Sequence, residues 1–161
     1  MLGTAETLRK KRSNQFLNSK NTKPELKVQR LLLEMGIFFI KHSKELAGTP
    51  DISIPSKKII LNIKGCFWHQ HGCLNSKMPK TNQLFWHEKF EKIKINDIDQ
   101  LLQNKNKGWT TFDLWECIIM DMEKIQLEIK RIICLSEKLM NASYADKISK
   151  NMYPQKNRVS L

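Results

Sequence analysis

Eight residues in the middle of the chain combine thiols and imidazoles at a spacing that suits metal binding. Residues 66–73 read Cys-Phe-Trp-His-Gln-His-Gly-Cys, so one short segment carries two cysteines and two histidines. Zinc prefers four nitrogen or sulfur ligands in a tetrahedron, and Cys66, His71 and Cys73 could supply three of them. Cys117 follows a predicted strand and could complete the set. The spacing therefore indicates a closed, structural zinc site.

The alternative for these cysteines is simple packing, because a free cysteine is often a small buried hydrophobe. We assign Cys134, on a predicted apolar helix, to that class and leave it out of the zinc site. His69 lies between the zinc ligands and has no metal role if Cys117 is the fourth ligand. A histidine in this place is either a spectator or a proton-transfer group.

A carboxylate and a lysine on two neighbouring strands form a pattern found in many metal-dependent nucleases. Asp51 follows a proline at the start of one predicted strand, and Asn62 and Lys64 end the next strand. Alternation along a strand puts residues 62 and 64 on the same face. In such nucleases carboxylates hold Mg²⁺, and the lysine stabilises charge or orients the attacking water. Asn62 stands where a second acid is expected, and Pro-Asp pairs are also common in turns.

Hydrophobic periodicity and turn residues predict the elements that must position these groups. The segment 22–25, Thr-Lys-Pro-Glu, predicts the start of a helix that Gly36 ends. Residues 65–80 lack periodicity and are expected to form a loop. Strands are predicted at 37–41, 51–54, 58–64 and 109–115, and further helices at about 82–107 and 121–140. The helix at 82–107 is expected to bury an apolar stripe formed by Phe90, Ile93, Ile98, Leu101 and Leu102.

The order of these elements predicts an α/β protein with a mixed central sheet. A chain of 161 residues has the size of one ordinary domain. We expect a flexible basic arm over residues 1–21, one domain over 22–140, and a polar, basic and poorly ordered tail over 141–161.

The charge of the chain indicates a polyanionic partner. Lys and Arg number 28 against 16 Asp and Glu, which gives a net charge of +12. Residues 1–30 hold eight of the basic residues and two acidic ones, so the arm is suited to a phosphate backbone; a solvated tail is the alternative. The apolar runs are too short to cross a membrane and the N-terminus lacks the pattern of a signal peptide. We therefore expect a soluble cytoplasmic protein.

Together these motifs resemble the very short patch repair endonucleases, enzymes that nick DNA at T:G mismatches. The likeness runs from about Arg12 to Leu135, and its most specific part is the Gly-Cys-Phe-Trp-His block with the His and Cys that follow. The matching segments are residues 19–25, 48–51, 65–73, 85–86 and 115–117. The resemblance implies a restriction-endonuclease-like, three-layer core of the PD-(D/E)xK type. It also implies Mg²⁺-dependent nicking 5′ of the T in T:G pairs that arise when 5-methylcytosine is deaminated.

The resemblance further implies roles for single residues. Asp51 and the backbone carbonyl of Ile63 would hold Mg²⁺, and His69 would be the general base. Glu25 and Asp97 match positions near the metal-bound water, although Glu25 is equally explained by a helix capping box with the preceding Thr. The structural zinc would be held by Cys66, His71, Cys73 and Cys117.

An aromatic wedge inserted beside the mismatch corresponds to Phe67, Trp68 and Trp86, and the basic arm corresponds to a segment that clasps DNA. Trp86 could instead belong to the core. The partner implied is double-stranded DNA with a T:G mismatch, bound by a monomer in the bacterial cytoplasm near the nucleoid, with mismatch-repair proteins as further partners.

Two residues depart from the family pattern. Lys64 stands where the best-known form has a second histidine, and it could stabilise charge instead; Asn14 stands in the arm where an apolar residue is expected. Because the second acid is missing at Asn62, a zinc-stabilised DNA-binding protein without catalysis is an alternative function. A nuclease of the same fold with another DNA target is a further one.

Overall fold

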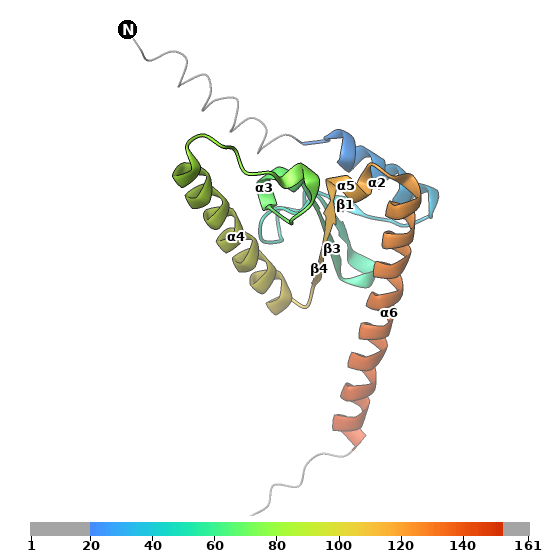
Figure 1. Cartoon of the computed structure of the whole chain (residues 1–161). Helices are drawn as coiled ribbons and strands as arrows, with labels where there is room; N and C mark the ends of the chain where they lie inside the picture. The colour runs from blue at the N-terminus through green and yellow to red at the C-terminus, as the bar shows by residue number, and fades with distance from the viewer. Residues whose placement is uncertain (1–19, 153–161) are drawn as a thin grey trace, which may run out of the picture.

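The structure is a computed structural model that describes residues 20–152, with side chains described from residue 20 to residue 142. Nearly all of the predicted basic arm, including Asn14, lies outside the described residues, as does the segment 153–161. Three layers are visible in Figure 1: α4 lies on one side of a sheet, and α2 and α6 lie on the other side. This arrangement agrees with the predicted α/β architecture.

Helix α2 spans Lys23–Glu34 and starts at the capping box predicted from the sequence. The backbone N–H of Glu25 is turned toward the hydroxyl of Thr22, while the Glu25 carboxylate accepts hydrogen bonds from Thr22 and from the N–H of Asn21. These contacts satisfy donors that a helix start otherwise leaves free. Gly36, at φ +68°, follows the helix end, since a residue without Cβ adopts this conformation freely.

Four strands form one mixed sheet in the order β1-β2-β3-β4. The first three strands are antiparallel neighbours, and β4 is parallel to β3. A parallel pair needs a long crossover connection, which α4 provides here. The strands are β1 Ile40–Lys41, β2 Ile52–Ile54, β3 Ile59–Lys64 and β4 Thr110–Trp115, and α4 spans Gln83–Asn106.

Alternation along β3 separates the core from the site. Ile59 and Leu61 are buried in a cluster with α2, α5 (Glu116–Ile119) and α6 (Met122–Met152). Lys64 points to the opposite side and contacts α4. Because successive side chains of a strand face opposite ways, the same strand supports the hydrophobic core on one face and polar chemistry on the other.

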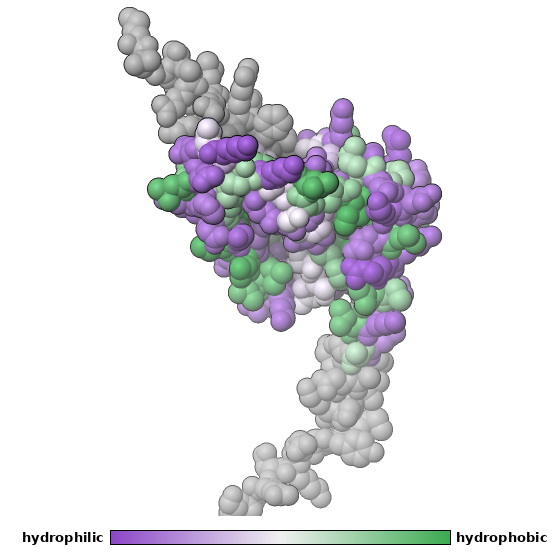
Figure 2. All heavy atoms as spheres, viewed as in Figure 1, coloured by the Kyte–Doolittle hydropathy of each residue, from purple (hydrophilic) through white to green (hydrophobic). Residues whose placement is uncertain are grey.

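The apolar stripe predicted on α4 is right only in its first half. Phe90 is buried and Ile93 half-buried, whereas Ile98, Leu101 and Leu102 are 44–59% exposed. Asn104 is the other buried residue of this helix. Asn104 explains the difference, because its side-chain amide exchanges two hydrogen bonds with the backbone of Ala47 and anchors the helix through polar contacts. The inward face of α4 is therefore partly polar. Figure 2 shows hydrophobic residues on the outer side of this helix.

Three predicted boundaries also change. Pairing at 37–41 is limited to Ile40–Lys41, because β2 has only three residues and Ile37 and Phe39 pack against the core instead. The predicted loop at 65–80 contains the helix α3 (Cys66–His69) and a 3-10 turn at Leu74–Ser76. Helix α6 passes its predicted end near Met140 and makes the first part of the expected tail helical, because no Gly or Pro interrupts residues 141–152.

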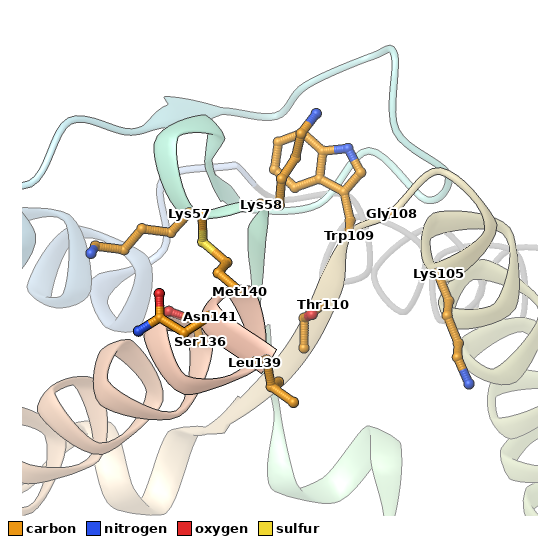
Figure 3. A pocket seen from close by; sticks show the side chains of 10 residues that line it. All are labelled: Lys57, Lys58, Lys105, Gly108, Trp109, Thr110, Ser136, Leu139, Met140 and Asn141. Atoms are coloured by element: carbon orange, nitrogen blue, oxygen red, sulfur yellow. The ribbon is translucent and has the colours of Figure 1, made fainter. Parts of the chain in front are cut away.

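A cavity of about 660 Å³ opens beside the first residues of β4, between the turn before β3 and helix α6. It is lined by Lys57, Lys58, Lys105 and Trp109 among others, and the ammonium of Lys58 lies over the Trp109 ring at 4.8 Å (Figure 3). The residues predicted to be catalytic lie at the other end of the sheet, where β3 and β4 end. Among the helices of residues 20–152, none is long and apolar enough to span a membrane.

Candidate active site and metal centre

The predicted catalytic residues gather where β3 ends, and strand pairing explains how Asp51 reaches that place. Asp51 directly precedes β2, which runs antiparallel to β3. Its Oδ2 accepts a hydrogen bond of 2.7 Å from the backbone N–H of Ile63. In a strand the N–H and C=O of one residue point to the same edge, so the carbonyl of Ile63 also faces the side of Asp51. Asp51 and this carbonyl, the two groups that the family resemblance assigns to Mg²⁺, therefore lie on the same side of β3.

Two further side chains join Asp51. Glu25, His42 and Asp51 offer ligand atoms that all lie within 4.8 Å of one another. Glu25 is 4% exposed, and its carboxylate serves both the helix cap and this cluster. His42 was not predicted. The strand register offers a signal for it: Lys41, the last residue of β1, pairs with Ile52, so His42 comes beside Asp51.

Burial raises the pKa of Asp51 above its ordinary value. The N–H of Ile63 opposes this shift, whereas the nearby Glu25 carboxylate adds to it, and His42 and Lys64 oppose it again. Two carboxylates in a poorly solvated place are costly to ionise together, and a bound cation removes that cost. The charge distribution around Asp51 therefore favours a divalent cation.

Asp97 on α4 connects two of the other predicted site residues. Its Oδ1 lies 2.6 Å from Nζ of Lys64, and its Oδ2 lies 2.7 Å from Nδ1 of His69. Partial burial acts to raise the pKa of Asp97, but the hydrogen bonds from His69 and Lys64 outweigh it and lower that pKa. An ionised carboxylate only accepts, so Nδ1 of His69 donates, and in the neutral ring the lone pair then lies on Nε2. This is the tautomer that a general base requires.

The side chain of Lys64 is 8% exposed, so its charge is held where water screens it weakly. The charge of Lys64 opposes the rise in the pKa of Asp51 and contributes to the lowered pKa of Asp97. One ammonium thus lies within electrostatic reach of both carboxylates. The Glu25, His42 and Asp51 cluster and the Asp97–His69 pair accordingly lie near one another, and the charge of Lys64 acts on both.

The four predicted zinc ligands also come together. Sγ of Cys66, Cys73 and Cys117 and a ring nitrogen of His71 lie within 4.8 Å of one another. The parallel register pairs Lys64 with Trp115, so Cys66 and Cys117, each two residues further along, lie at the same end of the sheet. Nε2 of His71 is 3.5 Å from Sγ of Cys117.

The surroundings of this Cys/His cluster hold its side chains in place. The His71 ring stacks on Trp115 with 4.2 Å between ring centroids, which restricts the orientation of the imidazole. In the metal-free cluster, burial raises the pKa of the Cys66 thiol to about 12. Three cysteine sulfurs and one imidazole nitrogen form a donor set that fits zinc. Cys134 is outside the cluster, as predicted, but it is exposed rather than buried.

Aromatic residues form a cluster next to the Cys/His loop. The ring of Phe67 packs edge to face against Trp68, Trp86 and Phe90, at centroid distances of 5.0–5.5 Å. Lys89 places its ammonium 4.9 Å from the centre of the Trp68 ring. Phe67, Trp68 and Trp86 are half-buried, so each ring keeps an open part. The family resemblance assigned these three rings to the wedge. Phe90 was predicted as part of the apolar stripe of α4, and Lys89 was not predicted.

Comparisons with known proteins agree with this arrangement. A family model described as DNA mismatch endonuclease Vsr matches residues 5–75. The chain is 36% identical over 119 residues to the type II nicking enzyme V.XorIIP of Xanthomonas oryzae pv. oryzae, covering 74% of this chain and 88% of that enzyme.

Two other relatives carry related names. The type II nicking enzyme V.NmeAIP of Neisseria meningitidis is 32% identical over 117 residues, with 73% of this chain and 84% of the relative covered. The DNA mismatch endonuclease Vsr of Escherichia coli is 31% identical over 107 residues, with 66% and 69% covered. The chain therefore belongs to the Vsr family of DNA mismatch endonucleases and is a phosphodiester hydrolase.

Proposed function

We propose that this endonuclease nicks DNA on the 5′ side of the T in T:G mismatches that arise from deaminated 5-methylcytosine. The reaction is a Mg²⁺-dependent hydrolysis of one phosphodiester bond that leaves a 3′-hydroxyl and a 5′-phosphate. The observation that carries the proposal is the Asp97 carboxylate shared by His69 and Lys64 beside Asp51. Together these residues supply a base (His69), a positively charged ammonium (Lys64) and a carboxylate that can bind a metal ion (Asp51), close to one another.

Asp51, Glu25 and the carbonyl of Ile63 are oxygen donors, which is the ligand type that Mg²⁺ prefers. Bound Mg²⁺ would neutralise the phosphate and the charge that develops on the leaving 3′ oxygen. Glu25 is held by its hydrogen bonds to the helix start, so its carboxylate is positioned before any cation arrives. Restricted ligands of this kind lower the cost of ordering the site.

His69 takes a proton from the attacking water through Nε2, because Asp97 holds the proton of Nδ1. Asp97 is a positioning residue in this step: it keeps the imidazole in one tautomer and stabilises it when it becomes charged. Lys64 balances the charge of Asp97 and lies near Asp51, so it can stabilise negative charge at the phosphate. It replaces in this role the second histidine of the best-known family form.

A structural zinc on Cys66, His71, Cys73 and Cys117 would fix the loop that carries both His69 and the aromatic residues. The rings of Phe67, Trp68 and Trp86 would then enter the duplex and replace lost base stacking, an exchange of about a few kcal/mol per step. A mismatched pair opens more easily than a matched one, which favours the T:G site.

Asn62 motivated the alternative of DNA binding without catalysis. Its amide donates to the exposed carboxylate of Asp113, 3.3 Å away, while the second carboxylate of the Asp51 cluster comes from Glu25 instead. The missing acid on β3 therefore has a replacement from α2. Catalysis is the better supported function, and a same-fold nuclease with another target is an outcome of the test.

The test is a nicking assay on labelled duplexes with T:G, with matched T:A or C:G, and with randomised flanks, each with and without Mg²⁺. Wild-type protein should nick the T:G strand 5′ of the T and require the cation. Asp51→Asn should bind the T:G duplex but fail to nick it, whereas Asp113→Asn, which changes an exposed carboxylate of the neighbouring strand, should nick normally. Binding without nicking by the wild type, or full activity of Asp51→Asn, would contradict the proposal.

A further inference from the structure

His42 is the one histidine of the described residues whose neighbours are two carboxylates, Glu25 and Asp51, and it has no part in the mechanism above. Its Nε2 lies 3.7 Å from Oε2 of Glu25, which is too long for a hydrogen bond. The same Nε2 is buried and has no hydrogen-bond partner among the described residues. A buried, unpaired polar nitrogen is costly, so such an atom in a native site calls for a partner that the protein itself does not supply.

The backbone at His42 points in the same direction. Its φ of +49° is a left-handed conformation that residues with a Cβ rarely adopt. The N–H of His42 donates to the carbonyl of Asp51 at 3.3 Å, so the two residues are tied together across the hairpin. Uncommon backbone conformations of this kind persist where the surroundings hold a side chain in a required place. Here that place is the Asp51 cluster.

The spacing fits a shared ion. Two ligands at about 2.1 Å from one ion lie roughly 3.0 Å apart at right angles and roughly 4.2 Å apart when opposite. The 3.7 Å between His42 and Glu25 falls within that interval. The unpaired Nε2 therefore faces a position from which one cation could also reach the carboxylates.

We propose that His42 is a nitrogen ligand of the catalytic cation, so that the site binds Mn²⁺ or a neighbouring transition ion more tightly than Mg²⁺. Imidazole suits transition ions, whereas Mg²⁺ takes oxygen ligands and adds little binding energy through nitrogen. Asp51, Glu25 and the carbonyl of Ile63 would hold Mg²⁺ for the reaction, and His42 would add a preference that the oxygen donors alone do not provide. This inference rests on the proposed function, because it assigns one more ligand to the same metal site.

The first test is electron paramagnetic resonance of the zinc-loaded protein with Mn²⁺ bound. Electron spin-echo modulation should show one directly bound imidazole nitrogen. The signal should disappear in His42→Asn, a substitution that tolerates the left-handed backbone, and persist in His87→Asn, which changes an exposed histidine of α4. Wild-type protein without a nitrogen signal overturns the proposal without any variant. A signal lost in His69→Asn and kept in His42→Asn overturns it as well.

The second test measures Mn²⁺ and Mg²⁺ affinities by calorimetric titration. The Mn²⁺ over Mg²⁺ preference should fall at least about tenfold in His42→Asn, with Mg²⁺ affinity nearly unchanged. Equal loss for both ions, or no loss, contradicts nitrogen ligation. Asp51→Asn separates the proposed catalytic metal site from the proposed role of His42. If Asp51→Asn binds both ions like the wild type, the proposed metal site is wrong. If Asp51→Asn loses both ions while His42→Asn binds them like the wild type, only the role of His42 is wrong.

Discussion

The ammonium of Lys64 lies 2.6 Å from Oδ1 of Asp97, and this ion pair joins the end of β3 to the middle of α4. It is the contact through which a strand of the sheet and the crossover helix share one site. Lys64 is buried, so removing Asp97 leaves the ammonium without its ion-pair partner on the polar face of the sheet. The pair therefore contributes to the positioning of His69, which uses the other oxygen of the same carboxylate.

Replacing Lys64 by Met should lower both stability and nicking. The fold should lose about 1–3 kcal/mol in free energy of unfolding, because Asp97 keeps His69 and some contact with water. Nicking of the T:G strand should fall by at least about 100-fold if the ammonium stabilises charge at the phosphate. Denaturant unfolding and single-turnover nicking measure the two effects.

The matched control for that variant is Lys57→Met, which removes an ion pair of similar length with the exposed Glu137. Exposed pairs contribute about 1 kcal/mol or less, and this one lies away from the site, so nicking should be unchanged. Normal nicking by Lys64→Met in a folded protein would exclude a catalytic role for the lysine.

Asp97→Asn should slow nicking by about 10²–10⁴-fold, because a neutral amide no longer holds His69 in the tautomer with its lone pair on Nε2. Binding of T:G duplex should change little, since Asp97 contacts protein groups. Asp99→Asn is the control, because Asp99 lies on the exposed side of the same helix and bonds Gln103. A nicking rate of Asp97→Asn equal to that of Asp99→Asn would show that Asp97 does not position the base.

Acidification should release the catalytic cation at a higher pH than an ordinary carboxylate would. Burial raises the pKa of Asp51, and the neighbouring Glu25 adds to this. The cation binds the ionised form, so its apparent affinity falls as pH decreases through that raised pKa. Calorimetric titration of Mg²⁺ over a series of pH values measures this fall.

The same raised pKa has a consequence for the metal-free fold. The folded state holds the Asp51 proton more tightly than the unfolded state, so stability decreases as pH rises through the folded pKa. At neutral pH, metal-free Asp51→Asn should therefore melt at a higher temperature than the metal-free wild type. Added Mg²⁺ should raise the melting temperature of the wild type but not that of Asp51→Asn. A metal-free Asp51→Asn that melts below wild type would contradict this prediction.

Removal of zinc should destabilise the Cys/His loop and stop nicking. Cys117→Ser should lose stoichiometric zinc, measured by elemental analysis. Its melting temperature should also drop, since the proposed ion would cross-link the segments that follow β3 and β4 through Cys66 and Cys117. Cys134→Ser, which changes the exposed cysteine outside the cluster, should retain both zinc and stability. Full zinc content in a folded Cys117→Ser would exclude Cys117 as a ligand.

Trp68→Ala should weaken binding of T:G duplex by about 1–3 kcal/mol, the usual contribution of one aromatic ring stacked on a base. Trp68→Phe should restore part of the loss, because it keeps a ring beside Phe67 and Lys89. Fluorescence anisotropy on mismatched and matched duplexes measures the effect, with Trp109→Ala, at the other end of β4, as the control. Equal losses in Trp68→Ala and Trp109→Ala would argue against a wedge.

Local patterns were sufficient wherever a feature depends on residues close in the chain. The capping box at Thr22 and Glu25 spans four positions, and the apolar centre of β3 is read directly from Ile59, Ile60 and Leu61. Three of the four predicted zinc ligands share one loop. The sequence named Cys117 only as a candidate for the fourth, and the parallel pairing of β3 and β4 brings it to the other three. In these cases composition and spacing leave few physical alternatives.

Contacts between distant elements required the folded chain. Asp97 lies 28 positions from His69, and its neighbours on α4 suggested an apolar stripe rather than a polar inward face. His42 carries no motif and meets Glu25 and Asp51 only because β1 pairs with β2 against the start of α2. Helix rotation and strand register decide which side chains meet across such distances. Both depend on the packing of the whole core, and no short segment of sequence encodes them.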